Sequence, residues 1–245
     1  VGAMIHSTTV GAVVTIELDR ADKRNALNDE MLAGLSDAFD AALGSGARAI
    51  VVTGRGPVFS AGADLSGPVY EKGFLDTLVG TLKKIESSPV PVLAALNGSA
   101  IGAGLQLAMA ADLRVMAPDA IAGIPAAKLG VAVDEWTIRR LVSLVGAGQA
   151  RGMLIGCDPL TADRAHALGF ANRIGDLADA QLVGRVQLVD GRRDAVGHRL
   201  VEGVLRLRAV DGDDQDAVSA VHLHLVGHRT LPRSVTRWSD RRAVG

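Results

Sequence analysis

The stretch at residues 96–112, LNGSAIGAGLQLAMAAD, restricts the possible folds of this chain more than any other. An apolar strand at 92–96 leads into a turn at 97–98, and the small residues 102–104 lead into an apolar helix. Glycine allows other groups close to the backbone, and the first N–H groups of a helix are unpaired and partly positive. The stretch therefore predicts either a binding site for a carbonyl oxygen that gains negative charge, or a turn whose small residues serve packing alone.

Length and composition narrow the class of protein. A chain of 245 residues with 48% hydrophobic residues can form one large domain, or one domain with an appendage. The formal net charge of −1 provides no basic surface for nucleic acid, and an aromatic content of 3% argues against a base-stacking platform. We therefore expect a globular protein that does not bind nucleic acid.

Other features of the sequence concern its location in the cell. Cys157 is the one cysteine, which excludes an internal disulfide and suits a reducing compartment. No apolar run reaches the roughly 18 residues that a membrane span needs. The N-terminus lacks the basic start and long apolar segment of a signal peptide. These features predict a cytoplasmic protein without a membrane span.

Segments with strand patterns alternate with segments that have helical periodicity. Strands are expected at 10–19, 49–53, 92–96 and 113–117, with a short strand and loop at 120–130. Helices are expected from Asn28, as N-cap, to glycines 44 and 46, and at 74–86, 105–111, 134–145, 148–155 and 161–168, the last capped by Thr161. Such alternation predicts an α/β fold with a largely parallel sheet.

Two loops share one chemistry. Residues 62–64 (GAD) follow the apolar strand AIVVT, and residues 102–104 (GAG) follow the strand VLAAL. Each loop offers backbone N–H groups beside small residues. One N–H donor from each loop, if the two converge, can stabilise a single carbonyl oxygen.

Several motifs, in order and spacing, resemble the enoyl-CoA hydratase/isomerase family, the crotonases. They are FSAGADL at 59–65, NGSAIGAGLQLAM at 97–109 and DLR at 112–114, while RNALN at 24–28 is similar to the family's early coenzyme A loop. The resemblance covers roughly residues 10–180. Each motif alone is weak, but together they are specific.

The resemblance implies a ββα spiral that binds coenzyme A thioesters as substrate or ligand, with no separate cofactor and no metal. It implies oxyanion donors at the N–H groups of Ala63 and Ala103. It also implies a trimer, often paired into a hexamer, whose C-terminal helices cover the site. The residues expected near coenzyme A are Arg24, Ala26, Ala61, Asp64, Leu65 and Gly104. For Arg24 and Asp64 the alternative is a solvated loop charge.

This sequence departs from the family at both catalytic positions. The resemblance places Gln106 and Ala126 where family hydratases carry two glutamates as general acid and base. A carboxamide can orient water or hydrogen-bond a thioester, but it cannot take a proton near neutral pH, and alanine can do neither. Efficient hydration by the two-glutamate route is therefore not expected.

Asp134 is the remaining carboxylate candidate. Residues 129–134 (LGVAVD) resemble the segment in which dienoyl-CoA isomerase relatives carry a catalytic aspartate. A buried aspartate with a raised pKa at this position would be able to shuttle a proton. The alternative is that Asp134 caps the helix that follows, and the two roles can coexist. The isomerases pair this aspartate with a glutamate that would fall at Ala126.

Other chemistries lack their residues. His6 and His166 have no matching nucleophile motif for a serine hydrolase, and Cys157 has no histidine near it in the sequence. No cluster has metal-ligand spacing. We therefore expect neither a hydrolase nor a metal site.

The chain divides into a crotonase core at 1–181, which would bind acyl-CoA, and a C-terminal region at 182–245. The C-terminal region is helical in the family, but here it contains no lysine, one glutamate and eleven arginines. Such a composition is typical of a GC-rich gene read out of frame. We hypothesise that this region is translated in the wrong frame; the alternative is a divergent but real tail.

These observations favour a protein of fatty-acid metabolism that binds an acyl-CoA or enoyl-CoA, or transfers it to a lipid-synthesis partner, with little or no hydratase activity. One alternative is an enoyl-CoA hydratase or isomerase that uses Asp134 as acid or base. Another is a structural subunit that no longer binds a ligand.

Overall fold

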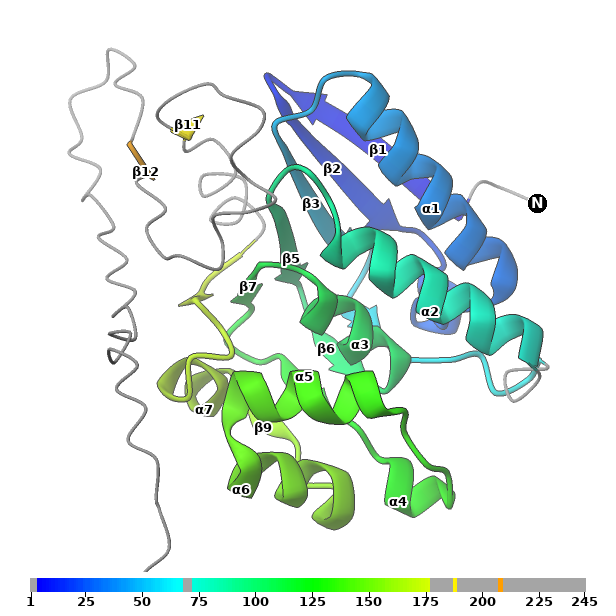
Figure 1. The fold of residues 1–245 in the computed structure, drawn as a ribbon, viewed down its shortest axis with the longest axis vertical. Coiled ribbons are helices and arrows are strands. Elements are labelled where there is room, and N and C mark those ends of the chain that lie inside the picture. The colour runs from blue at the N-terminus through cyan, green and yellow to red at the C-terminus, as the bar shows by residue number, and fades with distance from the viewer. Residues whose placement is uncertain (1–3, 68–71, 177–186, 189–206, 209–245) are drawn as a thin grey trace, which may run out of the picture.

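The computed structural model describes residues 4–67, 72–176, 187–188 and 207–208, and within them it contains two main sheets (Figure 1). The larger, six-stranded sheet has the order β1 (Ile5–Val10), β2 (Val13–Leu18), β3 (Ala49–Gly54), β5 (Val92–Leu96), β7 (Leu113–Met116), β10 (Arg173–Ile174). The smaller, four-stranded sheet has the order β4 (Val58–Ser60), β6 (Ser99–Ile101), β8 (Ile121–Gly123), β9 (Leu160–Thr161). Only the β1–β2 and β8–β9 pairs are antiparallel in these two sheets.

A ββα unit repeats along the chain, and it confirms the predicted crotonase-type α/β fold. In each unit one strand joins the large sheet, the next joins the small sheet, and a helix follows. The units are β3-β4-α2 (Lys72–Glu86), β5-β6-α3 (Ala103–Ala110) and β7-β8-α4 (Ala126–Leu129). The repeat places the end of each large-sheet strand beside the start of a small-sheet strand.

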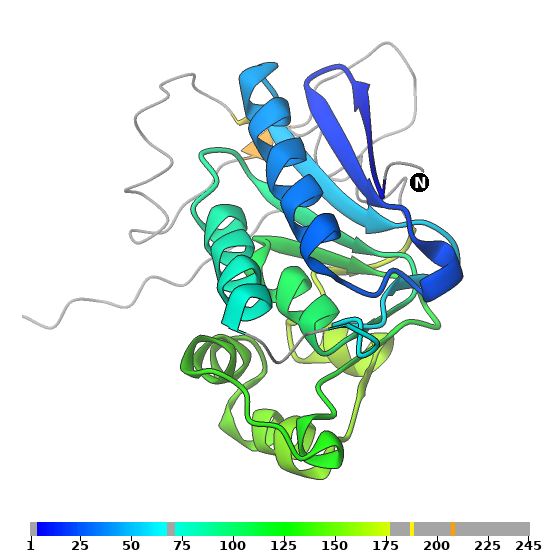
Figure 2. The ribbon, with the colours of Figure 1, turned by 90° about the vertical axis from the view of Figure 1, so that its right-hand side faces the viewer.

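Helices cover one face of the large sheet. Helix α1 (Asp29–Gly44), α2 and α3 lie side by side there (Figures 1 and 2). Alternate residues of the strands point toward these helices and form the main core; on β2 these are Val14, Ile16 and Leu18. A separate buried cluster on the other face includes Val13, Val51 and Leu93. Since both faces of the central strand β3 are buried, that strand is almost wholly apolar, as the sequence AIVVT indicated.

The remaining helices lie below α3 in Figure 1. They are α5 (Glu135–Val145), α6 (Ala147–Arg151), a π-helical turn at Gly152–Gly156, and α7 (Ala162–Ala167), while a short 3-10 helix at Ala21–Lys23 precedes α1. The predicted caps are confirmed: Asn28 Oδ1 accepts from Met31 N, and Thr161 Oγ1 accepts from Arg164 N. The helix expected at 148–155 is instead α6 followed by the π turn.

One strand prediction was wrong. The segment 10–19 was expected to be a single strand, but Val10 ends β1 and the following strand begins at Val13. The hairpin turn lies at Gly11, with φ of +61°. The four polar residues of β1, at 6–9, are all exposed, so this edge strand has no apolar pattern by which the sequence would reveal it.

Side-chain bonds from Asn97 join two ββα units. Asn97 Oδ1 accepts from Gly54 N at 3.0 Å, and Asn97 Nδ2 donates to Gly56 O at 2.7 Å. The turn after β5 is thereby fixed to the turn after β3. Because the loops at 62–64 and 102–104 follow these two turns, the bonds help to fix the position of one loop relative to the other.

The boundary predicted at 181/182 and nearly all of the C-terminal region lie outside the described residues. Within that region the structure describes an antiparallel pair, β11 (Gln187–Leu188) with β12 (Leu207–Arg208). In the part of the chain that the structure describes, no helix has the length and apolarity to cross a membrane.

Candidate functional site

The loop at 62–64 is fixed by a parallel bridge to the segment that precedes α1. Leu27 N donates to Gly62 O at 2.7 Å, and Leu27 O accepts from Asp64 N at 2.8 Å. In such a bridge the central residue turns its own N–H to the opposite side. The N–H of Ala63 is therefore directed away from Leu27.

The loop at 102–104 lies directly against this one. A Cβ atom built on Gly62 would stand 2.7 Å from Ile101 O and 3.5 Å from Ala103 N. Gly62 also has φ of +97°, which side chains rarely allow. The two glycine-rich loops, forty residues apart in the sequence, therefore lie in contact.

Ala103 is the first residue of α3, so its N–H has no acceptor within the helix. The glycine at 104 is needed for packing: a Cβ there would lie 2.6 Å from Ser60 Cβ and 2.7 Å from Ser60 O. Close packing of α3 on Ser60 accounts for Gly104 without any contact to coenzyme A.

Two arginines bind the other end of α3. Arg114 Nη1 donates to Ala111 O at 2.7 Å, and Arg140 Nε donates to Met109 O at 2.8 Å. Arg114 is 3% exposed, and its burial lowers the pKa of the guanidinium to about 10. Cations at the C-terminus of a helix interact favourably with the helix dipole, whose positive end here lies at Ala103.

Gln106 lies one turn into α3 and contacts α5. Its Nε2 donates to Thr137 Oγ1 at 2.5 Å and to Asp134 Oδ2 at 3.2 Å. Thr137 Oγ1 in turn donates to Asp134 Oδ2 at 2.6 Å. The structure thus places the carboxylate candidate beside the first position where the family resemblance expects a glutamate.

The Asp134 side chain is exposed, which is not the buried setting that a proton shuttle would need. Asp134 caps α5, accepting from Thr137 N at 3.0 Å through Oδ1. The cap and the contact with Gln106 occur together, since each uses a different carboxylate oxygen. Ala126, the second such position, is 7% exposed at the start of α4 and carries no polar group.

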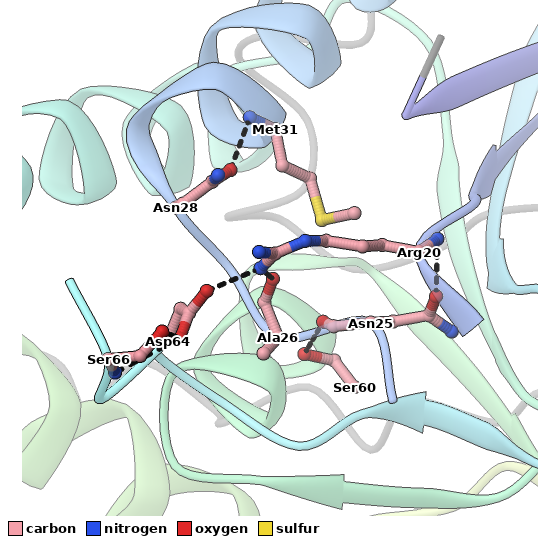
Figure 3. Close-up of polar contacts among 8 residues, drawn as sticks. All are labelled: Arg20, Asn25, Ala26, Asn28, Met31, Ser60, Asp64 and Ser66. Carbon is pink, nitrogen blue, oxygen red and sulfur yellow. Dashed lines mark hydrogen bonds and ion pairs between the residues drawn. The ribbon is translucent and has the colours of Figure 1, made fainter. Parts of the chain in front are cut away.

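The Asp64 carboxylate is not a free loop charge, because both of its oxygens accept hydrogen bonds. Its Oδ2 accepts from Arg20 Nη1 at 2.6 Å, and its Oδ1 accepts from Ser66 Oγ at 2.5 Å and Ser66 N at 3.1 Å (Figure 3). Arg20 Nη1 also donates to Ala26 O at 3.0 Å. The Ser66 hydroxyl, followed by Arg20, lowers the pKa of Asp64 to about 2.

Arg24 and Asn25 form a strained turn beside this ion pair, with φ of 53° at both residues. Asn25 is fully buried, and its Nδ2 donates to Val58 O. Its backbone O accepts from Ser60 Oγ (Figure 3). The side chain of Arg24 is exposed, and among the described residues it has no ion-pair partner.

The other residues expected near coenzyme A lie on the same two segments. Ala61 N donates to Arg24 O at 2.9 Å, which joins the segments directly. Ala26 uses its carbonyl oxygen for Arg20, and Leu65 is 59% exposed. The structure thus joins the two segments that carry Arg24, Ala26, Ala61 and Leu65.

Sequence reasoning missed Arg20 and Thr137. Arg20 pairs with a residue 44 positions away, so no local pattern marks it. Thr137 carries a weak signal, since it stands three residues after an expected N-cap, where the cap bond forms. Its contact with Gln106, 31 positions away, has no signal in one sequence.

The two histidines that the sequence analysis rejected as hydrolase residues have structural partners. His6 Nε2 lies 2.8 Å from Asp19 Oδ2, and His166 Nδ1 lies 3.0 Å from Ala171 O. Among the described residues, no three His, Cys, Asp or Glu side chains are arranged to hold a metal ion.

The ββα spiral and the converging loops define a crotonase-type domain, and comparison with known proteins agrees. The family model described as Enoyl-CoA hydratase/isomerase matches residues 8–189. This chain belongs to that family. It is 54% identical over 178 residues to "Probable enoyl-CoA hydratase echA6" of Mycobacterium tuberculosis (strain CDC 1551 / Oshkosh), covering 73% of each chain. It is 35% identical to "Probable enoyl-CoA hydratase" of Bacillus subtilis (strain 168), covering 70% of this chain and 68% of the relative.

Solved structures show the same fold. The enoyl-CoA hydratase from Thermoplasma volcanium GSS1 superposes with a TM-score of 0.70 at 34% identity, covering 74% of this chain and 76% of that one. Pseudomonas aeruginosa PA4980 gives a TM-score of 0.73 at 26% identity, covering 82% and 91%.

Proposed function

We propose that this protein binds acyl-CoA or enoyl-CoA thioesters and hydrates them poorly or not at all. The thioester carbonyl would accept from the N–H groups of Ala63 and Ala103. The observation that carries the proposal is the contact between the two loops, where a Cβ on Gly62 would lie 3.5 Å from Ala103 N. Two such donors in one place suit a carbonyl oxygen that gains negative charge.

The coenzyme A moiety would lie along the edge formed by Arg24, Ala26, Ala61 and Leu65. Arg24 is exposed and would meet a phosphate. Asp64 would not contact the ligand directly, because its carboxylate already accepts hydrogen bonds from Arg20 and Ser66. Its role is to hold the loop that carries Ala63.

Poor hydration follows from the residues at the two family positions. Gln106 cannot take a proton near neutral pH, and its nitrogen is already bonded to Thr137 and Asp134. Ala126 has no group that can activate water. The protein would therefore hold its ligand without converting it.

A second candidate is an isomerase or weak hydratase that uses Asp134. The distance of 3.2 Å between Asp134 Oδ2 and Gln106 Nε2 favours it, because it places a carboxylate next to the α3 helix start. Enoyl-CoA turnover that disappears in Asp134→Asn would identify this route.

Calorimetric titration with a chain-length series of saturated acyl-CoAs tests the proposal. We expect saturable binding that strengthens with chain length, because each buried CH₂ adds about 0.8 kcal/mol. Free coenzyme A serves as the control and should bind more weakly. Equal affinities for every ligand, or no binding, would contradict the proposal and favour a structural subunit.

A further inference from the structure

Two peptide groups connect the Arg20 side chain to the proposed Ala63 donor. Arg20 Nη1 donates to Ala26 O at 3.0 Å (Figure 3). The N–H of that same peptide group belongs to Leu27, and it donates to Gly62 O at 2.7 Å. The peptide group that contains Gly62 O also contains the N–H of Ala63. A series of hydrogen bonds, here called the peptide relay, therefore runs from the guanidinium through two peptide groups and ends at Ala63.

The planarity of the peptide group gives the direction of the last N–H in the relay. In a trans peptide the C=O and N–H bonds lie on opposite sides. Since Gly62 O faces Leu27, the Ala63 N–H is directed to the other side, and among the described residues it has no acceptor. The relay thus begins at a cation and ends at a donor that is available to a ligand.

The guanidinium is held at the start of the relay in a setting largely shielded from water. The side chains of Arg20 and Asp64 are 18% and 13% exposed. Asp64 Oδ2 accepts from Arg20 Nη1 at 2.6 Å, and Arg20 N donates to Asn25 Oδ1 at 2.9 Å. The carboxylate offsets part of the positive charge, but it fixes the nitrogen that donates to Ala26 O.

A charged donor at one end of such a relay strengthens the bonds that follow. In a shielded setting each hydrogen bond polarises the next group, by about 10–30% per bond. The bond from Arg20 polarises the peptide group whose N–H binds Gly62 O, and that bond polarises the group that contains the Ala63 N–H. The Ala63 N–H is thereby both fixed in direction and made a stronger donor.

We propose that Arg20 is a positioning residue for recognition of the thioester carbonyl and acts on the Ala63 N–H through the peptide relay. This inference rests on the proposed carbonyl site at Ala63 and Ala103. Its consequence is a selectivity: Arg20 favours ligands that have a carbonyl oxygen beside the sulfur over ligands that lack it. Arg20 does this without touching the ligand.

Binding of octanoyl-CoA and of its thioether analogue S-octyl-CoA, which has no carbonyl oxygen, tests this by calorimetry. The unaltered protein should bind the thioester about tenfold more tightly, as for two hydrogen bonds. In Arg20→Met this ratio should fall about two- to fivefold, because the relay loses its charged donor. The infrared stretching frequency of the bound carbonyl should move toward that of the free thioester. Arg20→Gln, a milder neutral change, provides both readouts if Arg20→Met does not fold.

Two further variants separate the relay from other effects. Arg55→Met is the matched control, because the Arg55 side chain donates to Asp19 at 2.5 Å and makes no bond to the relay, so the ratio should be kept. Asp64→Asn leaves Arg20 able to donate to Ala26 O, so the ratio should fall less than in Arg20→Met. An equal fall in either variant would overturn the route through Ala26.

The outcomes keep this proposal distinct from the proposed function. An unchanged ratio and carbonyl frequency in a folded Arg20 variant, including an equal loss of affinity for both ligands, would overturn the role of Arg20 while the carbonyl site stands. Equal affinities of the two ligands for the unaltered protein would overturn the carbonyl site and this inference together. Failure of both ligands to bind would overturn acyl-CoA binding itself.

Discussion

Gly62 lies so close to Ala103 that a Cβ on Gly62 would stand 3.5 Å from the Ala103 nitrogen and 2.7 Å from the carbonyl oxygen of Ile101. The two loops can therefore approach only with glycine at this position. The geometry of the carbonyl site depends on that approach, and substitutions on either loop should change ligand affinity.

Gly62→Ala should lower both stability and affinity. The new methyl group meets the Ile101 oxygen, and φ of +97° is unfavourable for alanine. We expect the free energy of unfolding to fall by about 1–3 kcal/mol, as for one strained residue. Gly44→Ala is the control, because no atom lies within 4 Å of its added Cβ, and it should unfold at the same or a higher urea concentration.

Ala103→Pro removes one of the two proposed donors. Proline is tolerated at the first position of a helix, so the variant should fold. Acyl-CoA binding should weaken by about 1–3 kcal/mol, the cost of leaving a buried acceptor without its partner. Ala162→Pro, at the first position of α7, makes the same change away from the loops and should bind normally. Unchanged affinity in folded Ala103→Pro would place the carbonyl elsewhere.

Crotonyl-CoA hydration should be at least about a thousandfold slower than in a hydratase that carries both glutamates, because each general acid or base contributes about 10²–10⁴. Gln106→Glu combined with Ala126→Glu should raise the rate. The new carboxylate at 106 would lie beside Asp134, so adding Asp134→Asn should increase the gain by removing a like charge. Rapid hydration of crotonyl-CoA by the unaltered protein would contradict the prediction of a slow rate.

Asp64 should make stability depend on pH in the acid range. Its pKa is about 2 in the folded protein, against an ordinary value of 3.8, because of the bonds from Ser66 and Arg20. A lowered folded pKa stabilises the protein above the unfolded value, and this contribution is lost as pH falls from about 4 to about 2.

Asp64→Asn should therefore lower the free energy of unfolding near neutral pH by about 1 kcal/mol, less than the full shift implies because water screens a surface loop. The difference from the unaltered protein should shrink toward pH 2, as followed by urea unfolding. Asp40→Asn, which removes an exposed pair with Lys84, should change stability less at neutral pH. A difference that is the same at every pH would remove the link to ionisation of Asp64.

Resequencing tests the hypothesis that residues 182–245 are read out of frame. We expect another frame to encode a segment rich in lysine, glutamate and helix-forming residues. A gene with no such frame would end the hypothesis. A protease-resistant C-terminal region in a clean trimer or hexamer, seen by light scattering, would equally show that the present residues fold.

Local signals predicted local structure well. The caps at Asn28, Asp134 and Thr161 were readable because a polar side chain and the N–H that it accepts lie three residues apart. The alternation of apolar strands and helices gave the α/β class, and the resemblance gave the ββα spiral. The proposed chemistry requires the two loops to lie together, and the structure shows them in contact at Gly62.

Contacts between distant residues were not predictable from one chain. Strand β6 (Ser99–Ile101) is only three residues long and pairs with β4 and β8, so its pattern was hidden within a turn. Arg20 appeared as one charge in an irregular segment, although it pairs with Asp64. A proton-transfer role would favour a buried Asp134, but cap positions are usually near water, and the Asp134 side chain is exposed.

Equilibrium dialysis with crotonyl-CoA, followed by chromatography of the recovered thioester, tests directly whether the protein binds its ligand without converting it. We predict that the ligand accumulates in the protein compartment and is recovered as crotonyl-CoA. Equal concentrations in both compartments, or recovery as 3-hydroxybutyryl-CoA within the time of dialysis, would contradict binding without hydration.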